Sequence, residues 1–382
     1  MKVLHLFSNH KWTGPAEPAL NLCLALRARG IDADFACSPH VGATPNKIVE
    51  TARDRGIEPI LDLQLSKHRH PLKNPSDVRV LGRLLAERRY DVVHCHLDND
   101  HQIALRATRR RGIPIVRSSY AGNGLANDRR HARLLAGTAR LIEPAEAALE
   151  HDATVFGFPR KHMRVVPGAV DVARFDPQRE TPDGRRWMGI PHDAFVVGIV
   201  ARLQTHRRYY DLFAAFRRLV DEDPRGHLVV VGRGTHQDAV GHRPVRGLEL
   251  EGHVHFTGFI DGENYVGMLR SFDVGVFLVP GSDGTCRAAR EIMAMARPMV
   301  VADRGMLPEI VSDGENGVVF DGTADALCNA LRALRDDRRL RRDLGAAARH
   351  TAETRYSLEA QSAAVQEVYE GLLRSTARSS RA

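Results

Sequence analysis

A strand, a glycine-rich loop, a helix and a second strand follow one another in the second half of the chain. Residues 273–278 and 299–302 are short apolar runs typical of buried strands. Between them, residues 279–285 predict a loop, and residues 286–296 predict a helix that Thr285 can cap. This succession is the repeating unit of a parallel α/β sheet, and it constrains the fold more than any other feature of the sequence.

The start of that helix is a candidate anion site, because its first N–H groups have no partner within the helix. Asp283 lies in the loop just before the helix, and Glu291 lies about two turns into it. A nucleotide sugar would place its diphosphate on the amides and its hydroxyls on the two carboxylates. The alternative is a glycine loop that binds nothing and a solvated Glu291, and the spacing alone leaves both open.

The same alternation of strand and helix recurs along the whole chain. Apolar strand patterns at residues 1–7, 32–37, 90–96 and 113–116 are separated by helical patterns, and a new series opens at residues 195–201. We predict doubly wound parallel sheets, whose ligands bind at the carboxyl ends of the strands. A chain of 382 residues is too long for one ordinary core, so we expect two domains.

The composition predicts a cytoplasmic protein. The five cysteines are odd in number and form no C-x-x-C pair, which fits a reducing compartment. No apolar run reaches the length of a membrane span, and the first strand is too short for a secretion signal.

The positive charge is concentrated in the first half. Residues 1–180 contain 28 Lys and Arg against 20 Asp and Glu, whereas residues 181–382 contain 27 of each. Such a basic half can contact anionic lipid at the inner membrane face. The alternative is a solvated arginine-rich surface. Nucleic acid is not expected as a partner, because no nucleic-acid-binding motif accompanies the charge.

Several motifs resemble those of glycosyltransferase family 4, the retaining group 1 enzymes of the GT-B fold. Asp283 and Glu291 resemble the E-x(7)-E signature, with Asp in place of the first Glu. Arg202 and Arg207 resemble the two cations of the G-R-L-x(3)-K-G element. Further similarities lie at residues 91–96, 165–171, 255–259 and 305–311, so the resemblance spans nearly the whole chain.

The resemblance implies a nucleotide-sugar site in the second domain. It assigns Asp283 to the donor sugar and Glu291 to the ribose. Arg202 and Arg207 would stabilise the departing diphosphate, which a guanidinium can hold with two parallel hydrogen bonds. The catalytic residues are therefore expected to be Arg202, Arg207 and Asp283. The expected donor-binding residues are Gly14, Arg202, Arg207, Phe256, Thr257, Asp283, Gly284, Thr285, Cys286, Arg287 and Glu291.

The acceptor side is expected to include Lys11, His94 and Tyr120. Tyr120 stands where the family usually has a histidine beside the reacting sugar, and Pro15 stands where its first loop usually has a second glycine. A phenol does not change charge near neutral pH as imidazole does. Tyr120 is therefore expected to hydrogen-bond the sugar or the acceptor, or simply to pack.

Two patterns could in principle hold a metal ion. His94 and His96 share one face of a predicted strand, and Asp98-Asn99-Asp100 resembles the D-x-D motif of the other glycosyltransferase fold. GT-B enzymes need no bound metal, so we expect neither a metal nor another cofactor, apart from the UDP-, GDP- or ADP-sugar donor.

The predicted architecture is two Rossmann-like domains facing a cleft. The acceptor-binding domain spans residues 1–172 and is completed by a C-terminal helix at residues 356–374, and the donor-binding domain spans residues 190–355. The expected function is retaining hexosyl transfer to a glycan or lipid-linked acceptor in surface polysaccharide or lipopolysaccharide assembly. Two alternatives stay open: a nucleotide-sugar epimerase of the same fold, and a degenerate protein that only binds a nucleotide sugar or glycan.

Overall fold

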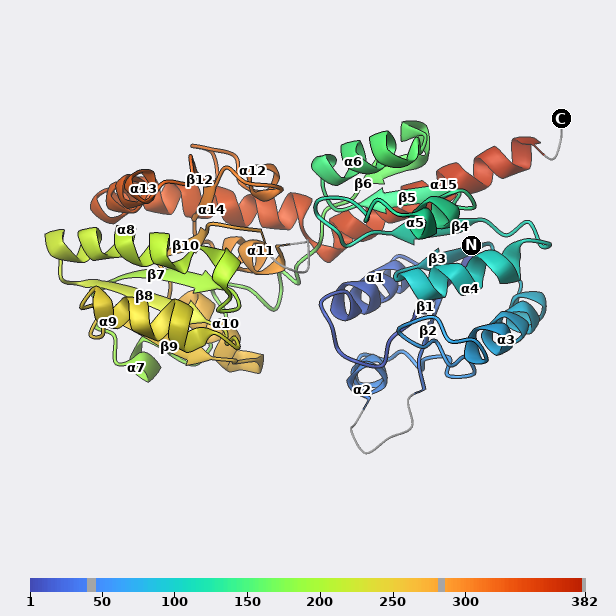
Figure 1. Cartoon of the computed structure of the whole chain (residues 1–382), viewed down its shortest axis with the longest axis horizontal. Helices are drawn as coiled ribbons and strands as arrows, with labels where there is room; N and C mark the ends of the chain where they lie inside the picture. Colours follow the sequence, from blue (N-terminus) through green and yellow to red (C-terminus); the bar gives the residue numbers. More distant parts are fainter. Residues whose placement is uncertain (40–45, 281–285, 380–382) are drawn as a thin grey trace. The chain divides into compact units, whose positions relative to one another are not determined.

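The computed structural model describes residues 1–39, 46–280 and 286–379. The chain divides into two compact units. Unit 1 comprises residues 1–168 and the C-terminal helix α15 (Leu358–Ser379), and unit 2 comprises residues 169–357. Each unit contains a six-stranded sheet with helices on both faces (Figure 1). The predicted fold class, parallel α/β sheets of the doubly wound type, is confirmed.

The sheet of unit 1 has the strand order β2-β1-β3-β4-β5-β6, and its strand pairs are parallel. The order reverses between β1 and β3, because the chain first adds β2 on one side of β1 and then returns to the other. Ligands of open α/β sheets bind at such a switch point, beyond the carboxyl ends of the strands. The strands are β1 (Lys2–Phe7), β2 (Asp32–Cys37), β3 (Val92–Cys95), β4 (Ile115–Ser118), β5 (Arg140–Glu143) and β6 (Met163–Val165).

Helices cover both faces of this sheet, which is why its strands are apolar on both sides. Val92 and Val116 face a core shared with α1 and α15, to which α15 contributes Tyr369. Val93 and Cys95 face a second core, shared with α3 and α4. The helices of unit 1 are α1 (Ala16–Ala28), α2 (Lys47–Asp54), α3 (Lys73–Arg88), α4 (Asp98–Thr108), α5 (Arg129–Leu135), α6 (Glu146–Phe156), the 3₁₀ turn η1 (Arg160–His162) and α15.

The sheet of unit 2 has the order β12-β11-β10-β7-β8-β9, with the reversal between β7 and β10. The strands are β7 (Phe195–Val200), β8 (Gly226–Val231), β9 (Val254–Gly258), β10 (Val274–Phe277), β11 (Met299–Ala302) and β12 (Gly317–Phe320). The helical segments are α7 (Gly184–Met188), η2 (Thr205–Arg207), α8 (Tyr209–Glu222), η3 (Asp238–His242), α9 (Arg243–Gly247), α10 (Gly262–Arg270), α11 (Arg287–Ala294), α12 (Leu307–Ile310), α13 (Ala324–Asp336) and α14 (Arg338–Arg355).

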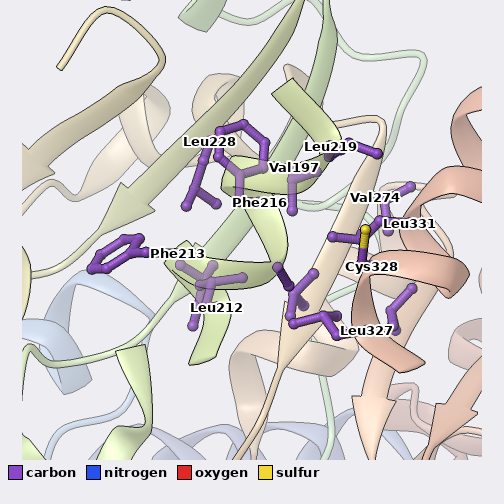
Figure 2. Packing of buried hydrophobic residues seen from close by; sticks show 14 of the residues in the cluster. Val197, Leu212, Phe213, Phe216, Leu219, Leu228, Val274, Leu327, Cys328 and Leu331 are labelled. Carbon is purple, nitrogen blue, oxygen red and sulfur yellow. The ribbon is translucent and has the colours of Figure 1, made fainter. Parts of the chain in front are cut away.

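The core of unit 2 is formed by α8, α13 and one face of the sheet (Figure 2). Most apolar residues of α8 recur at helical spacing and are buried, so this helix has one continuous face against the sheet. Burying one such side chain contributes roughly 1.5–3 kcal/mol. The residues labelled in Figure 2 are Val197, Leu212, Phe213, Phe216, Leu219, Leu228, Val274, Leu327, Cys328 and Leu331.

Within the described residues, no helix combines the length and the apolar character that crossing a membrane requires.

Candidate functional site

The predicted donor-site residues of unit 2 follow the two strands at its switch point. Arg202 and Arg207 follow β7, and Arg287 and Glu291 follow β10. Asp283, Gly284 and Thr285 were also predicted there, and these three lie outside the described residues.

The two predicted cations have different environments. Arg202 is exposed, whereas the Arg207 side chain is buried. Nη1 of Arg207 donates to the backbone oxygen of Pro280 at 2.6 Å and to that of Val279 at 3.3 Å. Arg207 therefore links the loop after β7 to the loop after β10, and Arg202 is the cation of the pair that faces solvent.

The turn after β8 supports the same loop through two glycines. A Cβ at Gly232 would lie 2.3 Å from the backbone oxygen of Ala201, and a Cβ at Gly234 would lie 2.0 Å from that of Leu203. Gly232 also has φ +139°, a backbone conformation that residues with a side chain rarely adopt. The glycines thus let the turn pack directly against the backbone around Arg202. Tyr209, which follows the loop after β7, also stabilises that loop: its hydroxyl donates to the backbone oxygen of Ala201 at 3.0 Å.

Glu291 is a nearly buried carboxylate with two partners on different elements. Tyr265 of α10 donates its hydroxyl to Oε2 at 2.5 Å, and Nε of Arg287 lies 3.1 Å from Oε1. Burial and the neighbouring Glu291 raise the pKa of Tyr265 well above its usual range, so this tyrosine remains a donor. The Arg287 pair is one helical turn apart, which favours contact. Tyr265 was not predicted, because no local sequence pattern indicates that a residue of α10 contacts Glu291 of α11.

The remaining predicted donor residues lie at the edges of this region. Cys286 precedes α11 in a left-handed conformation, φ +47°, and is buried. Phe256 on β9 packs against the His242 ring, with centroids 4.5 Å apart. The hydroxyl of Thr257 donates to the backbone oxygen of Gly258 at 2.9 Å.

The loop after β1 in unit 1 contains the predicted Lys11 and Gly14. Both are exposed, and the amide of Lys11 donates to Oδ1 of Asn9 at 3.1 Å. Asp100 joins this loop to the loop after β3, since it accepts the amide of Ser8 at 2.8 Å and that of Leu97 at 3.0 Å.

Three histidines lie together on one face of this sheet. His5 on β1 pairs in register with His94 on β3, and His96 follows two residues after His94. The rings of His94 and His96 stack with centroids 4.6 Å apart. All three are fully buried, and burial lowers the pKa of each, that of His5 to about 3. They are therefore neutral at physiological pH.

The predicted acceptor-side residues His94 and Tyr120 belong to two different hydrogen-bonded chains. Nδ1 of His94 lies 2.5 Å from the Tyr369 hydroxyl, and Nε2 lies 2.8 Å from Oγ of Ser118. His94 thus joins β3, β4 and α15 inside unit 1. Tyr120 is half-buried, and its hydroxyl lies 2.7 Å from Nδ1 of His96. His5 was not among the predicted site residues, because its contact with His96 depends on the pairing of β1 with β3.

Both candidate metal patterns already have internal partners. The ligand atoms of His5, His94 and His96 lie within 4.8 Å of one another, close enough for a metal ion. Both ring nitrogens of His94 and of His96 are, however, within hydrogen-bond distance of other groups. In the D-x-D pattern, Asp98 lies 3.0 Å from Nη2 of Arg117, while burial raises the pKa of Asp100 to about 7. The two carboxylates thus serve different partners.

A cavity of about 350 Å³ opens in unit 1 near the loop after β1. Two lysines, Lys67 and Lys73, are the charged side chains in its lining, together with the partly buried His10. The other lining residues are Ser38, Pro39, Gln64 and Ser66. A pocket that combines cations with hydroxyl and amide groups can bind a phosphate group.

Two parallel six-stranded α/β units, each with its candidate residues at the switch point, define the GT-B fold class. Solved structures agree with this class. HepE (Alr3699) of Anabaena, crystallised with UDP, is similar with a TM-score of 0.77 and 18% identity over 97% of this chain and all of that one. A glycosyltransferase of Rickettsia africae is similar with a TM-score of 0.82 and 16% identity, covering 97% of this chain and 98% of that one.

The family follows from the sequence comparisons. Residues 182–351 match the model of glycosyl transferases group 1, and residues 13–174 match that of glycosyltransferase family 4. Together the two models cover most of the chain, which belongs to this family of nucleotide-sugar-dependent transferases.

Two curated relatives that resemble this chain are both named D-inositol 3-phosphate glycosyltransferase. The relative from Thermomonospora curvata is 28% identical over 294 residues, which are 69% of this chain and 68% of the relative. The relative from Corynebacterium jeikeium is 34% identical over 224 residues, 55% of this chain and 52% of the relative. The alignments therefore span between about half and two thirds of these relatives' length.

Proposed function

We propose that this protein transfers a hexosyl group from a nucleoside-diphosphate sugar to an acceptor hydroxyl with retention of the anomeric configuration. The support is the set of residues at the switch point of unit 2. Glu291 would accept hydrogen bonds from the ribose, and Arg202 would contact the diphosphate. Arg207 would fix the loop on which the diphosphate rests. The expected role of Asp283 at the donor sugar belongs to the same proposal.

The chemical demand of such a transfer is negative charge on the departing diphosphate. Cations and oriented amides that are fixed before the reaction stabilise that charge without reorganising. In unit 2 Arg202 would supply the cation, and the amides that begin α11 would supply the oriented dipoles, since the start of a helix favours anions. When the leaving phosphate itself takes the acceptor proton, no separate protein base is needed, and Tyr120 can serve as a hydrogen-bonding group.

The observation that carries the proposal is the position of Glu291. It is 5% exposed, yet it is a carboxylate held between Tyr265 and Arg287 in the helix that follows β10. Burying a carboxylate is costly unless it is hydrogen-bonded. The contacts with Tyr265 and Arg287 offset the cost of burying the Glu291 carboxylate. In the helix after the switch-point strand β10, the same carboxylate would bind the ribose.

The test is calorimetric titration with UDP, GDP and ADP. One nucleotide is expected to bind selectively, and Glu291→Gln is expected to weaken it by roughly tenfold, the value of one charged hydrogen bond. Glu353→Gln, an exposed acidic residue on α14, is the matched control. Failure of all three nucleotides to bind would contradict the proposed donor class and favour the degenerate alternative in its glycan-binding form.

The epimerase alternative requires a different product. Incubation with the selected nucleotide sugar in the absence of acceptor would convert it to a second nucleotide sugar if the protein were an epimerase. A transferase would leave the donor intact or slowly hydrolyse it. Proton NMR of the anomeric signal separates these results and, with an acceptor present, reports whether the configuration is retained.

The acceptor is proposed to carry a phosphate. The lysine-containing pocket supports this choice, because Lys67 and Lys73 add two cations to a lining that also contains two serines and a glutamine. The curated relatives are named for an inositol phosphate, which is a small phosphorylated polyol. A lipid-linked glycan, the acceptor expected for surface polysaccharide or lipopolysaccharide assembly, also carries phosphate, but joined to a large apolar chain.

The acceptor test compares the two classes directly. With D-inositol 3-phosphate as acceptor, Lys67→Gln and Lys73→Gln are each expected to raise the acceptor KM about tenfold without changing the donor KM. Lys47→Gln, an exposed lysine on α2, is the control. Transfer to a lipid-linked phosphate, with no transfer to the inositol phosphate, would contradict the polyol acceptor and show that the acceptor is lipid-linked.

Contact with an anionic membrane at the inner face is a separate part of the proposal. Its support is a group of exposed arginines on α4, α5 and the turn after α4, two helices that pack together. Flotation with vesicles containing phosphatidylglycerol is expected to recover the protein, and less of the double variant Arg109→Gln/Arg110→Gln. The exposed pair Arg338→Gln/Arg342→Gln on α14 is charge-matched and should change nothing. Equal recovery of the protein with neutral vesicles would contradict the proposed contact with anionic lipid.

A further inference from the structure

The half-buried Tyr120 is the outer end of a hydrogen-bonded chain that runs into the core of unit 1. Its hydroxyl lies 2.7 Å from Nδ1 of His96, and Nε2 of His96 lies 3.0 Å from Nδ1 of His5. Nε2 of His5 is the inner end of the chain, and it has no hydrogen-bond partner among the residues that the structure describes. His5 and His96 are both fully buried.

Two proton arrangements are possible in this chain, because each neutral imidazole carries one N–H. In the inward arrangement Tyr120 donates to His96, which donates to His5, and the N–H on Nε2 of His5 is left buried without an acceptor. In the outward arrangement His5 donates from Nδ1 to His96, and His96 donates from its own Nδ1 to Tyr120. The outward arrangement leaves only the lone pair on Nε2 of His5 without a donor. It is favoured, because a buried N–H group without an acceptor is rarer than a buried acceptor without a donor.

We infer that His5 and His96 are positioning residues that hold the Tyr120 hydroxyl as a hydrogen-bond donor toward the substrate. Because the hydroxyl oxygen is occupied by the N–H of His96, its own hydrogen must point elsewhere. Tyr120 follows β4 at the carboxyl edge of the sheet, where ligands of such sheets bind. The group that it recognises is therefore an oxygen with an available lone pair, a sugar hydroxyl or a phosphate oxygen of the bound substrate.

Burial keeps the hydrogen-bonded chain of Tyr120, His96 and His5 in one protonation state over the physiological pH range. It lowers the pKa of both histidines and raises that of Tyr120. The hydroxyl is consequently a constant donor, unlike a solvent-exposed histidine, which would change between one and two N–H groups near neutral pH. This inference rests on the proposed function for the identity of the ligand, but not for the direction of the hydrogen bonds.

The direction can be measured without any activity. Long-range ¹⁵N–¹H spectra of protein labelled at histidine distinguish the two neutral tautomers by the nitrogen shifts. His5 and His96 are expected to carry their protons on Nδ1, with signals assigned from His5→Gln and His96→Asn. A proton on Nε2 of His96 would overturn the inference, whatever the fate of the proposed function.

The positioning role has a kinetic test. Tyr120→Phe is expected to lower kcat/KM about tenfold, the loss of one hydrogen bond to substrate. His96→Phe should cause a similar loss in the wild-type background and none in the Tyr120→Phe background. His96→Asn, whose amide N–H can replace Nδ1–H, should restore part of the activity. Losses that multiply in the double variant would show that His96 does not act through Tyr120.

The control for this cycle is His94, which lies on the same strand and stacks on His96 but is bonded to Tyr369 and Ser118. His94→Asn is expected to lose the same factor in the wild-type and Tyr120→Phe backgrounds, because its contacts do not include Tyr120. A His94 effect that also disappears in the Tyr120→Phe background would mean that the whole cluster, and not the His5–His96 chain, orients the hydroxyl.

Discussion

The hydrogen bond between Tyr265 and Glu291 makes a quantitative prediction for the stability of unit 2. Tyr265→Phe removes a donor 2.5 Å from a carboxylate that is 5% exposed, and it changes the volume of the side chain very little. A hydrogen bond to a charged group contributes about 1.5–3 kcal/mol. Water has little access to replace it, so we expect the free energy of unfolding of unit 2 to fall by about 2 kcal/mol.

The assay is urea unfolding followed by tryptophan fluorescence. The chain has two tryptophans, Trp12 in unit 1 and Trp187 in unit 2, so Trp12→Phe leaves one reporter for unit 2. Trp187 lies on α7, which packs against the helix that contains Tyr265. With a urea dependence of about 2–3 kcal/mol/M, the midpoint should fall by roughly 0.7–1 M.

The matched control is Tyr210→Phe, the same chemical change at a side chain that is 63% exposed. It should shift the free energy by less than about 0.5 kcal/mol. Equal midpoints for the Tyr265 and Tyr210 variants would refute the reasoning, because the buried hydrogen bond would then contribute nothing. If Tyr265 also orients Glu291 for the ribose, its variant should bind UDP several-fold more weakly.

Two further predictions concern the loops and the charges of the candidate site. Gly234→Ala should destabilise unit 2 by about 1–3 kcal/mol, because the new Cβ would lie 2.0 Å from a backbone oxygen; Gly247→Ala, with no atom within 4 Å of its new Cβ, should be neutral in the same unfolding assay. The hydrogen bond to Asp98 raises the pKa of His131 in the folded protein, so its stabilisation is complete below about pH 6.5 and is lost as the pH rises through the folded pKa. Unit 1, followed by fluorescence in the Trp187→Phe background, should therefore lose more stability between pH 6 and 8 than its His131→Gln variant does. Identical pH slopes would contradict the role of this histidine.

The architecture could be predicted from the sequence because parallel strands buried on both faces leave continuous apolar runs. The expected strand at residues 273–278 is β10 (Val274–Phe277), and the strand expected at residues 299–302 is β11. The helix between them was expected to start at residue 286 and starts at Arg287. Periodicity determines such elements almost alone.

Side-chain directions in the loops could not be predicted in the same way. Arg202 and Arg207 are the two cations of one basic motif, yet one faces solvent and the other donates to the carbonyls after β10. That difference depends on which backbone groups another strand brings nearby. His5 is similar, because its partnership with His96 exists only through the pairing of β1 with β3. Tertiary contacts of this kind leave no local pattern in the sequence.

The C-terminal helix gives unit 1 an unusual order of assembly. Its core includes Val365, Tyr369 and Leu372 of α15, and His94 is bonded to Tyr369. A ribosome must therefore synthesise the whole of unit 2 between the two parts of unit 1, which takes roughly 10–40 s at 5–20 residues per second. During that time the apolar face prepared for α15 has no cover from its own chain. A premature stop codon near the end of the gene would therefore damage the first unit to be made, because that unit would lack α15.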